Sequence, residues 1–465
     1  MKSPGFRHGA VSKCNFETMQ GCPGPERLIE KRAEIVPDMT NVWYEYVPKG
    51  YDPEKKYPLV VQLHGGGMDG KRWSKMTIWH MLADEYGIIV IYPNSPDYQT
   101  WMLTGRDTQY LYDLIERVCA VYSVDRSRIY MQGMSNGDQM TLAFAIKHPE
   151  VLAAAGFATG PTAPELFEEG EQPTAPLPVI QMRGEKDLLP SENAGDPTKD
   201  RYALRYSLND FNRHIWTKIN GLEAQPSLTV RGKDNFLFYK GEKADLINWE
   251  VRDMGHREPP DEAQVFWNYL YSGRARVNGE LTDTGALRRL DGEENAFVIS
   301  LGSTKLYKKD KAVMMSTDKN AIVRYFEPAS QNAFGFAGLD EMLETGALYA
   351  PVDFFKAAFD AKIEYVELGD KVKVSFPDGK EADFYAGSTL VRYMGDYRAM
   401  KKPCVLLCGL LYVPVGEFCG DIMCLSVSEA DDCMLISEKQ AQLGRYTARV
   451  LREILGGQRR PPSAE

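Results

Sequence analysis

The stretch Arg128–Pro149, "RIYMQGMSNGDQMTLAFAIKHP", decides the fold of the first part of the chain. An apolar run stops at Gly-Met-Ser-Asn-Gly and restarts as an amphipathic helix from about Gly137 to His148. A serine on a tight strand-to-helix turn exposes its hydroxyl group, and flanking glycines let the backbone and the helix close around it. The pattern makes Ser135 a candidate nucleophile. The alternative is that Ser135 only caps the helix while the glycines serve the turn.

Short apolar runs alternate with helical stretches on both sides of this turn. The strand-like runs are Tyr57–Leu63, Gly87–Tyr92, Arg128–Gln132, Leu152–Ala158, Leu177–Arg183 and Leu246–Arg252. The other helical stretches are Trp73–Tyr86, Gln109–Tyr122, Arg201–Ile219 and Asp261–Tyr271. Continuous apolar runs are typical of strands buried on both faces of a parallel sheet. The alternation predicts an α/β fold with a doubly wound, mostly parallel sheet, in which ligands bind at the carboxyl ends of the strands.

A base and an acid for the serine follow two of the later strands. His256 comes directly after the last predicted strand in "VRDMGHREPP", and Asp187 follows an earlier one in "RGEKDLLP". An aspartate in this position would orient the imidazole and stabilise its charged form. Glu185 and Asp253 are rivals for the acid, and for each of these residues the alternative is a solvated loop position. The chain order Ser, Asp, His is the order expected of α/β-hydrolases.

The segment "LHGGGMDG", residues 63–70, follows an early strand and supplies a candidate oxyanion site. Consecutive glycines allow backbone N–H groups to turn toward a small anion. We expect Gly65 and Gly66 to act together with the N–H of Asn136. The alternative is a flexible turn with a buried His64.

Two aromatic residues lie just beyond another strand end, in "PDYQTWMLTG". Trp101 and Tyr98 could stack on a planar aromatic acid, and together with His64 they are the candidate substrate contacts. The alternative for Trp101 is packing in the core. Acyl transfer by a serine requires no metal or organic cofactor, so none is expected.

These motifs together resemble the polyhydroxybutyrate depolymerase and feruloyl esterase group of α/β-hydrolases. The resemblance covers roughly residues 40 to 272 and rests on "YPLVVQLHGGGMDG", on the serine turn and on the "MGH" loop followed by "FWNYL". It implies a nucleophile at Ser135, an acid at Asp187, a base at His256, and oxyanion donors in the His64–Gly67 loop and at Asn136.

The resemblance implies a serine carboxylic ester hydrolase that forms an acyl-enzyme, with hydroxycinnamoyl esters of the feruloyl or chlorogenate type as the expected substrates. Alternatives within the enzyme class are a polyester depolymerase, an acetyl xylan esterase and a peptidase of similar fold. An alternative of another class is a non-catalytic protein that binds a polymer or a cell wall. The serine turn reads Ser-Asn-Gly-Asp where Ser-Ala-Gly-Gly is commoner in the group, which leaves the ester open.

Length and charge limit the possible partners. A chain of 465 residues exceeds a single core, and we expect an extension at 1–25, a hydrolase domain at 26–275 and a second domain at 278–465. The formal net charge of −10 argues against nucleic acid or an anionic membrane as partner. The first residues lack the apolar core of a secretory signal, as expected of a cytoplasmic chain or of a secreted chain after its signal has been removed.

The second domain contains an internal echo. "LYAPVDFFKAAFDAKIEYV" from Leu348 is followed by "LYVPVGEFCGDIMCLSV" from Leu411, each reading as strand, short helix and strand. These units resemble the copper amine oxidase N-terminal-like domains of bacterial extracellular proteins, which implies a smaller α+β accessory domain and a secreted or cell-surface location. No copper is expected, because no histidine follows His256.

This domain is expected either to contact a polysaccharide or a cell wall, or to serve packing or homo-oligomer formation. Five cysteines lie in it, and we interpret them as small buried apolar residues rather than ligands. They are Cys404, Cys408, Cys419, Cys424 and Cys433.

Overall fold

The computed structural model describes residues 24–97, 99–160, 163, 166–167, 170, 172–187, 201–285, 287–315, 321–325, 346–366 and 370–457, with only the backbone described at 201–208 and 325. The chain divides into two compact units. The first comprises Met1–Ala224, Phe238–Trp249 and Asp253–Arg289, and the second comprises Gln225–Leu237, Glu250–Arg252 and Leu290–Glu465. The sequence predicts a division between residues 275 and 278 but does not anticipate that two short earlier segments join the second unit.

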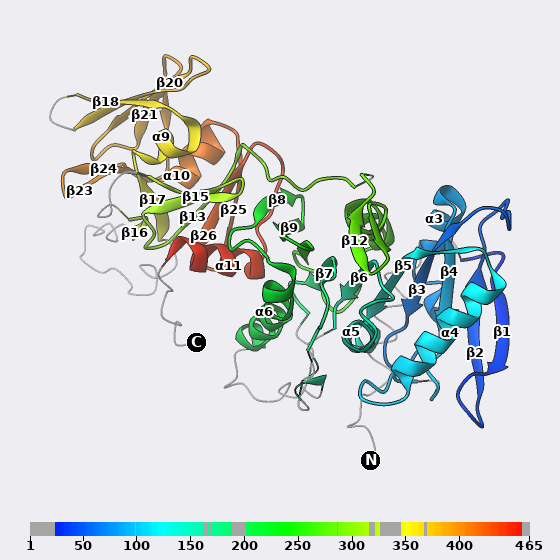
Figure 1. The fold of residues 1–465 in the computed structure, drawn as a ribbon. Helices are drawn as coiled ribbons and strands as arrows, with labels where there is room; N and C mark the ends of the chain where they lie inside the picture. The colour runs from blue at the N-terminus through cyan, green and yellow to red at the C-terminus, as the bar shows by residue number, and fades with distance from the viewer. Residues whose placement is uncertain are drawn as a thin grey trace. The chain divides into compact units, whose positions relative to one another are not determined.

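A ten-stranded sheet forms the centre of the first unit, and its strands run from blue to green in Figure 1. Its order is β1 (Ile29–Glu34), β2 (Thr40–Tyr46), β4 (Ile89–Pro93), β3 (Tyr57–Leu63), β5 (Val124–Met134), β6 (Ala154–Ala158), β7 (Val179–Gly184), β10 (Leu246–Val251), β9 (Asp234–Tyr239) and β8 (Ser227–Arg231). Pairing is antiparallel from β1 to β2 and from β2 to β4, and parallel from β4 through β3, β5 and β6 to β7. The sheet is therefore mixed, and the predicted parallel strands form the run from β4 to β7.

Helices cover both faces of this sheet. They are α2 (Gly70–Trp73), α3 (Trp79–Tyr86), α4 (Asp107–Val121), α5 (Asn136–Lys147), α6 (Arg201–Asn220) and α7 (Glu262–Phe266), which continues into the π-helical turn η3 (Trp267–Tyr271). The β3–β4 crossover runs in the direction opposite to the β4–β5 and β5–β6 crossovers. Because such crossovers are right-handed, α3 lies on one face while α4 and α5 lie on the other. Strands β5, β6 and β7 are parallel, and β10 starts beside the start of β7, where the N–H of Val179 donates to the carbonyl of Asp245; the carboxyl ends of β5, β7 and β10 therefore form one edge.

The expected helix Trp73–Tyr86 is broken, which corrects the sequence prediction. Helix α2 ends at Trp73 and α3 begins at Trp79. The hydroxyl of Ser74 donates to the carbonyl of Lys71 over 2.9 Å, and the β-branched pair Thr77 and Ile78 follows. Local side-chain bonds and β-branched residues both weaken helix continuation.

The second unit is built from antiparallel sheets and short helices. A five-stranded sheet has the order β15 (Lys311–Met314), β14 (Lys305–Lys308), β13 (Ala296–Ser300), β26 (Cys433–Ser437) and β25 (Ser426–Ala430). A four-stranded sheet contains β16 (Val323–Tyr325), β17 (Ala347–Pro351), β24 (Leu410–Val413) and β23 (Val405–Leu407). A third runs from β18 (Lys362–Val366) through β19 (Lys371–Ser375), β20 (Glu381–Tyr385) and β21 (Leu390–Tyr393) to β22 (Asp396–Ala399). The helical elements are α9 (Phe354–Phe359), α10 (Val415–Glu417), η5 (Phe418–Ile422) and α11 (Arg445–Leu455).

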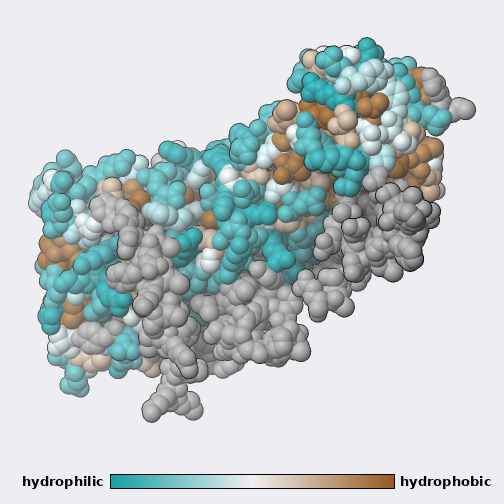
Figure 2. All heavy atoms as spheres, turned by 180° about the vertical axis from the view of Figure 1, so that it is seen from behind, coloured by the Kyte–Doolittle hydropathy of each residue, from teal (hydrophilic) through white to brown (hydrophobic). Residues whose placement is uncertain are grey.

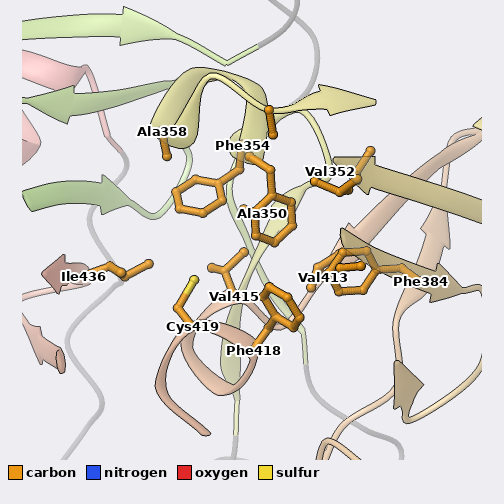
Figure 3. Close-up of a cluster of buried hydrophobic side chains, with 14 of the residues drawn as sticks. Ala350, Val352, Phe354, Ala358, Phe384, Val413, Val415, Phe418, Cys419 and Ile436 are labelled. Carbon is orange, nitrogen blue, oxygen red and sulfur yellow. The ribbon is translucent and has the colours of Figure 1, made fainter. Parts of the chain in front are cut away.

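A hydrophobic core joins these elements within the second unit. Figure 3 shows side chains of α9 and of the α10–η5 segment pointing toward one another, with Phe384 and Ile436 from two strands around them. The Phe355 ring lies 5.3 Å from that of Phe418 and 5.4 Å from that of Phe384, between ring centroids. Aromatic pairs at these separations add to the free energy of area burial. The unit therefore has its own core.

The interpretation of the five C-terminal cysteines is correct for three of them. Cys404, Cys419 and Cys433 are buried, and burial raises the pKa of the Cys404 thiol to about 12. Cys408 and Cys424 are exposed instead. Both have a positive φ, 52° and 61°, and neither lies in a strand or helix: Cys408 is in the turn between β23 and β24, and Cys424 is in the loop between η5 and β25.

The coloured part of the surface in Figure 2 is mainly hydrophilic, with small separate groups of hydrophobic residues. Within the described ranges, no helix is both long and apolar enough to cross a membrane.

Candidate active site

Ser135 lies on the strand-to-helix turn that the sequence predicts, between β5 and α5, and its backbone there is strained. Ser135 has φ 57° and ψ −116°, and its N–H donates to the carbonyl of Ala158 over 2.8 Å. A Cβ on Gly133 would lie 2.0 Å from the carbonyl oxygen of Gly137, and one on Gly137 would lie 2.4 Å from that of Leu63. Only glycine fits at both positions. The two glycines therefore allow β5, β3 and α5 to meet closely enough to lift Ser135 out of the sheet edge.

The structure brings the three predicted catalytic residues together. His256 Nε2 lies 2.9 Å from Ser135 Oγ, and His256 Nδ1 lies 3.0 Å from Asp187 Oδ2. Asp187 is fully buried and the His256 side chain is 13% exposed. Because Asp187 accepts from Nδ1–H, Nε2 is left to accept the serine proton. A Cβ on Gly184 would come within 2.4 Å of the carbonyl oxygen of Gly255, so this glycine permits the acid and histidine loops to lie against each other.

Glu185 and Asp253, the rivals of Asp187, bind groups other than the His256 ring. The Glu185 carboxylate accepts from the backbone N–H of Asp253 over 2.9 Å, and the Asp253 carboxylate lies 2.7 Å from Lys186 Nζ. The backbone N–H of Lys186 donates to the carbonyl of Met254 over 2.7 Å. These bonds fasten the acid loop to the histidine loop. They support Asp187 as the partner of the imidazole.

The glycine loop lies against the serine turn. A Cβ on Gly65 would be 3.4 Å from Ser135 Cβ, and one on Gly66 would be 3.9 Å from Asn136 Cβ. The carbonyl of Gly65 accepts from the His64 ring over 2.9 Å and from the N–H of Met68 over 3.3 Å. In a trans peptide the next N–H points the opposite way, so the Gly66 N–H faces away from these bonds. Asn136 is the first residue of α5, where an N–H has no acceptor within the helix.

Comparison with known proteins shows which family the chain resembles. Residues 42–169 match the family model described as Esterase PHB depolymerase. Feruloyl esterase B of Talaromyces funiculosus is 32% identical over 262 residues, which span 50% of this chain and 73% of that protein. The chain belongs to the esterase family of this relative.

Two further comparisons differ in extent. The bifunctional acetylxylan esterase/xylanase of Neocallimastix patriciarum is 29% identical over 144 residues, so that the match spans 30% of this chain and only 21% of that relative. The structure of the acetyl xylan esterase from Aspergillus awamori aligns with 52% of this chain and 97% of its own, at 18% identity and a TM-score of 0.41.

Two of the three predicted substrate contacts are instead buried supports of the esterase site. His64 is fully buried, its Nε2 accepts from the N–H of Ser95 over 3.1 Å and its Nδ1 binds the carbonyl of Gly65. Burial lowers the pKa of His64 to about 4, so the ring is neutral. Trp101 is 2% exposed and its Nε1–H donates to the carbonyl of His64 over 2.9 Å. The alternative of core packing therefore describes Trp101 better than stacking on substrate. Tyr98 lies outside the described residues.

The side-chain amide of Asn136 holds the segment that contains Trp101, which the sequence did not predict. Asn136 Oδ1 accepts from the backbone N–H of Trp101 over 2.7 Å. The residue thus offers a backbone donor to the oxyanion site and a side chain to the segment that supports the glycine loop.

A buried ion pair beneath the esterase's serine turn was also missed. Asp138 Oδ2 lies 3.2 Å from Arg183 Nη1 and accepts from the N–H of Gly160 over 2.8 Å. The pair connects α5 to β7, the strand that leads to Asp187. The signal was present in the sequence, since Asp138 replaces a glycine that is common in the group and a buried carboxylate requires a partner.

Two buried glutamates near the histidine loop should make stability depend on pH. Burial raises the pKa of Glu262 to about 8 and that of Glu258 well above its ordinary value, and each is further raised by neighbouring acidic groups. Glu262 accepts from the amide of Gln132. Since the folded state holds the protons more tightly than the unfolded chain, this stability is present below about pH 4.5 and is lost as pH rises through about 8.

We therefore expect Glu262→Gln, which keeps an acceptor for Gln132, to flatten the decline of the free energy of unfolding between pH 5 and 8. The slope removed should approach about 1.4 kcal/mol per pH unit. Urea unfolding at several pH values measures it, with the exposed Glu280→Gln as the matched control. Equal slopes in Glu262→Gln and the unchanged chain would contradict the expectation.

Proposed function

We propose that the chain is a serine carboxylic ester hydrolase. The observation that carries the proposal is the continuous contact from Ser135 Oγ through the His256 ring to Asp187. Ser135 attacks the ester carbonyl while His256 Nε2 takes its proton, and the proton then passes to the departing alcohol. Water, deprotonated by the same nitrogen, then attacks the acyl-enzyme, and His256 returns the proton to Ser135 Oγ as the acid is released.

Two backbone N–H groups stabilise the negative charge on the oxygen of the tetrahedral intermediate. We propose the N–H groups of Gly66 and Asn136, with Gly65 keeping the loop close to the serine. Each such donor in comparable enzymes lowers the barrier by about 3 kcal/mol. His64 and Trp101 act on the reaction by holding the loop through its carbonyl groups.

We propose hydroxycinnamoyl esters as the substrates. The support is the match with feruloyl esterase B, of which the aligned region spans 73%. Acetylxylan and polyester substrates are the alternatives, because other relatives and the family model carry those names. The burial of Trp101 removes the sequence-based argument for an aromatic acyl pocket formed by that residue.

The substrate proposal predicts a preference between two soluble esters. We expect kcat/KM for methyl ferulate to exceed that for a short aliphatic 4-nitrophenyl ester by about 10- to 100-fold, as binding of a larger acyl group allows. Methyl cinnamate, which lacks the ring oxygens, controls for ring size alone. Faster turnover of the aliphatic ester would leave an acetyl esterase or a polyester depolymerase as the better assignment.

We also propose that the second unit contains a duplicated segment of the accessory-domain type. Strand β17, helix α9 and strand β18 follow one another as β24, α10–η5 and β25 do. The pairing of β17 with β24 joins Ala350 to Val413, which are equivalent positions of the two sequence copies. A role in attachment to polysaccharide is a proposal that co-sedimentation of the whole chain with insoluble xylan would test.

A further inference from the structure

The carboxylate of Glu250, in strand β10, caps helix α11. Its Oε1 accepts from the N–H of Tyr446 over 2.9 Å, and its Oε2 accepts from the N–H and the hydroxyl of Thr447 over 2.9 and 2.8 Å. Glu250 is 3% exposed, so these bonds replace water around a buried side chain. They also satisfy first-turn N–H groups that have no acceptor within the helix. A Cβ on Gly444 would lie 2.2 Å from Glu250 Oε2, so a side chain there would displace the cap.

Arg252 fastens the same end of the strand a second time. Its Nη1 donates to the hydroxyl of Ser428 over 2.8 Å and to the carbonyl of Leu443 over 2.5 Å. Its backbone N–H donates to the carbonyl of Lys233 over 2.9 Å. The N–H of Leu443 donates to the Ser428 hydroxyl over 3.0 Å, which fixes that hydroxyl between the two segments.

The segment that precedes α11 is itself held by the β8–β9 turn and by the start of β9. Asn235 donates its amide to the carbonyl of Gln442 over 3.0 Å and accepts from the N–H of Gly444 over 2.9 Å. The N–H of Gln442 donates to the carbonyl of Gly232 over 2.7 Å. All of these residues belong to the second unit. Residues 440–447 are thus a fixed support for the end of β10.

The supported end of β10 leads directly into the histidine loop. His256 follows Arg252 by only four residues, and its Nε2 must stay within hydrogen-bond reach of Ser135 Oγ. A displacement of about 1 Å at a catalytic group can cost about 100-fold in rate. We infer that Glu250 and Arg252 are positioning residues, through which the segment 440–447 sets the place of His256. The inference rests on the proposed esterase function and adds a catalytic requirement to the second unit.

The test compares Glu250→Gln with the whole unchanged chain. A glutamine keeps one acceptor but turns an N–H₂ group toward a donor of α11, so the cap is lost on one side. We expect kcat on a soluble ester to fall about 10- to 100-fold with KM within about twofold, and the rate of labelling by a fluorophosphonate to fall in parallel. Glu453→Gln, which changes an exposed acid on the same helix, should leave both rates within about twofold.

Two milder variants at Thr447 test the inference if Glu250→Gln does not fold. Thr447→Val removes one hydroxyl bond while both N–H donors remain, and we expect a fall in kcat of about 3- to 10-fold that Thr447→Ser restores. Unchanged kcat in Thr447→Val, or in a folded Glu250→Gln, would overturn the inference. Absence of ester turnover and of labelling in the unchanged chain would instead refute the proposed function, so the two failures are distinguishable.

Discussion

Ser135→Ala is expected to lower kcat for ester hydrolysis by about 10⁵- to 10⁶-fold and to leave the chain folded. The hydroxyl is the group that forms the acyl-enzyme, and without it the oxyanion donors and substrate binding leave only about 10³- to 10⁴-fold acceleration over the uncatalysed reaction. Alanine removes a single oxygen and keeps the Cβ, so the backbone at φ 57° is no more strained than before. Turnover of methyl ferulate and near-ultraviolet circular dichroism measure the two halves of the expectation.

Ser127→Ala is the matched control, because Ser127 lies on the same strand and bonds only locally to Asp125 in the described contacts. A fluorophosphonate should label one serine per chain in the unchanged protein and in Ser127→Ala, and none in Ser135→Ala. Turnover by Ser135→Ala above about 1% of the original rate would show that another residue is the nucleophile.

The buried parallel strands were predictable because their sequences carry a strong local signal. Strand β3 has the predicted bounds Tyr57–Leu63, since its apolar run is preceded by two lysines and followed by His64 and three glycines. Strand β1 was missed for the opposite reason. It is an antiparallel edge strand with the sequence "IEKRAE", and a charged, half-exposed strand has no apolar run to detect.

The catalytic positions were predictable because each follows a strand whose carboxyl end lies on the common edge. Fold topology then brings Ser135, Asp187 and His256 together although they are far apart in the chain. The burial of His64 and Trp101 was not predictable in the same way. Burial depends on tertiary neighbours, and the bond from Trp101 to the carbonyl of His64 joins two loops whose separation the sequence does not reveal.

That the segments Gln225–Leu237 and Glu250–Arg252 belong to the second unit was unpredictable for a related reason. Glu250 is the one charged residue of the mainly apolar strand "LINWEV", and the groups that donate to its carboxylate lie 196 and 197 residues later, at Tyr446 and Thr447. A buried acid in a central strand does predict that a partner exists. The identity of that partner depends on long-range packing.

Asp187→Asn is expected to lower kcat by about 10⁴-fold, because asparagine cannot hold the imidazole in the tautomer that leaves Nε2 free to accept. The amide has the same shape as the carboxylate at this fully buried position, so the fold should be retained. The effect belongs to kcat rather than KM, since the acid contacts the histidine and not the ester. Steady-state kinetics with methyl ferulate measure it.

The rival acids supply the controls. Glu185→Gln and Asp253→Asn should each change kcat by less than about tenfold, because the first carboxylate binds the backbone of the histidine loop and the second pairs with Lys186. Their loss loosens the loop without changing the charge next to the imidazole. A fall of about 10⁴-fold in either variant, with Asp187→Asn near full activity, would transfer the role of the acid to that residue.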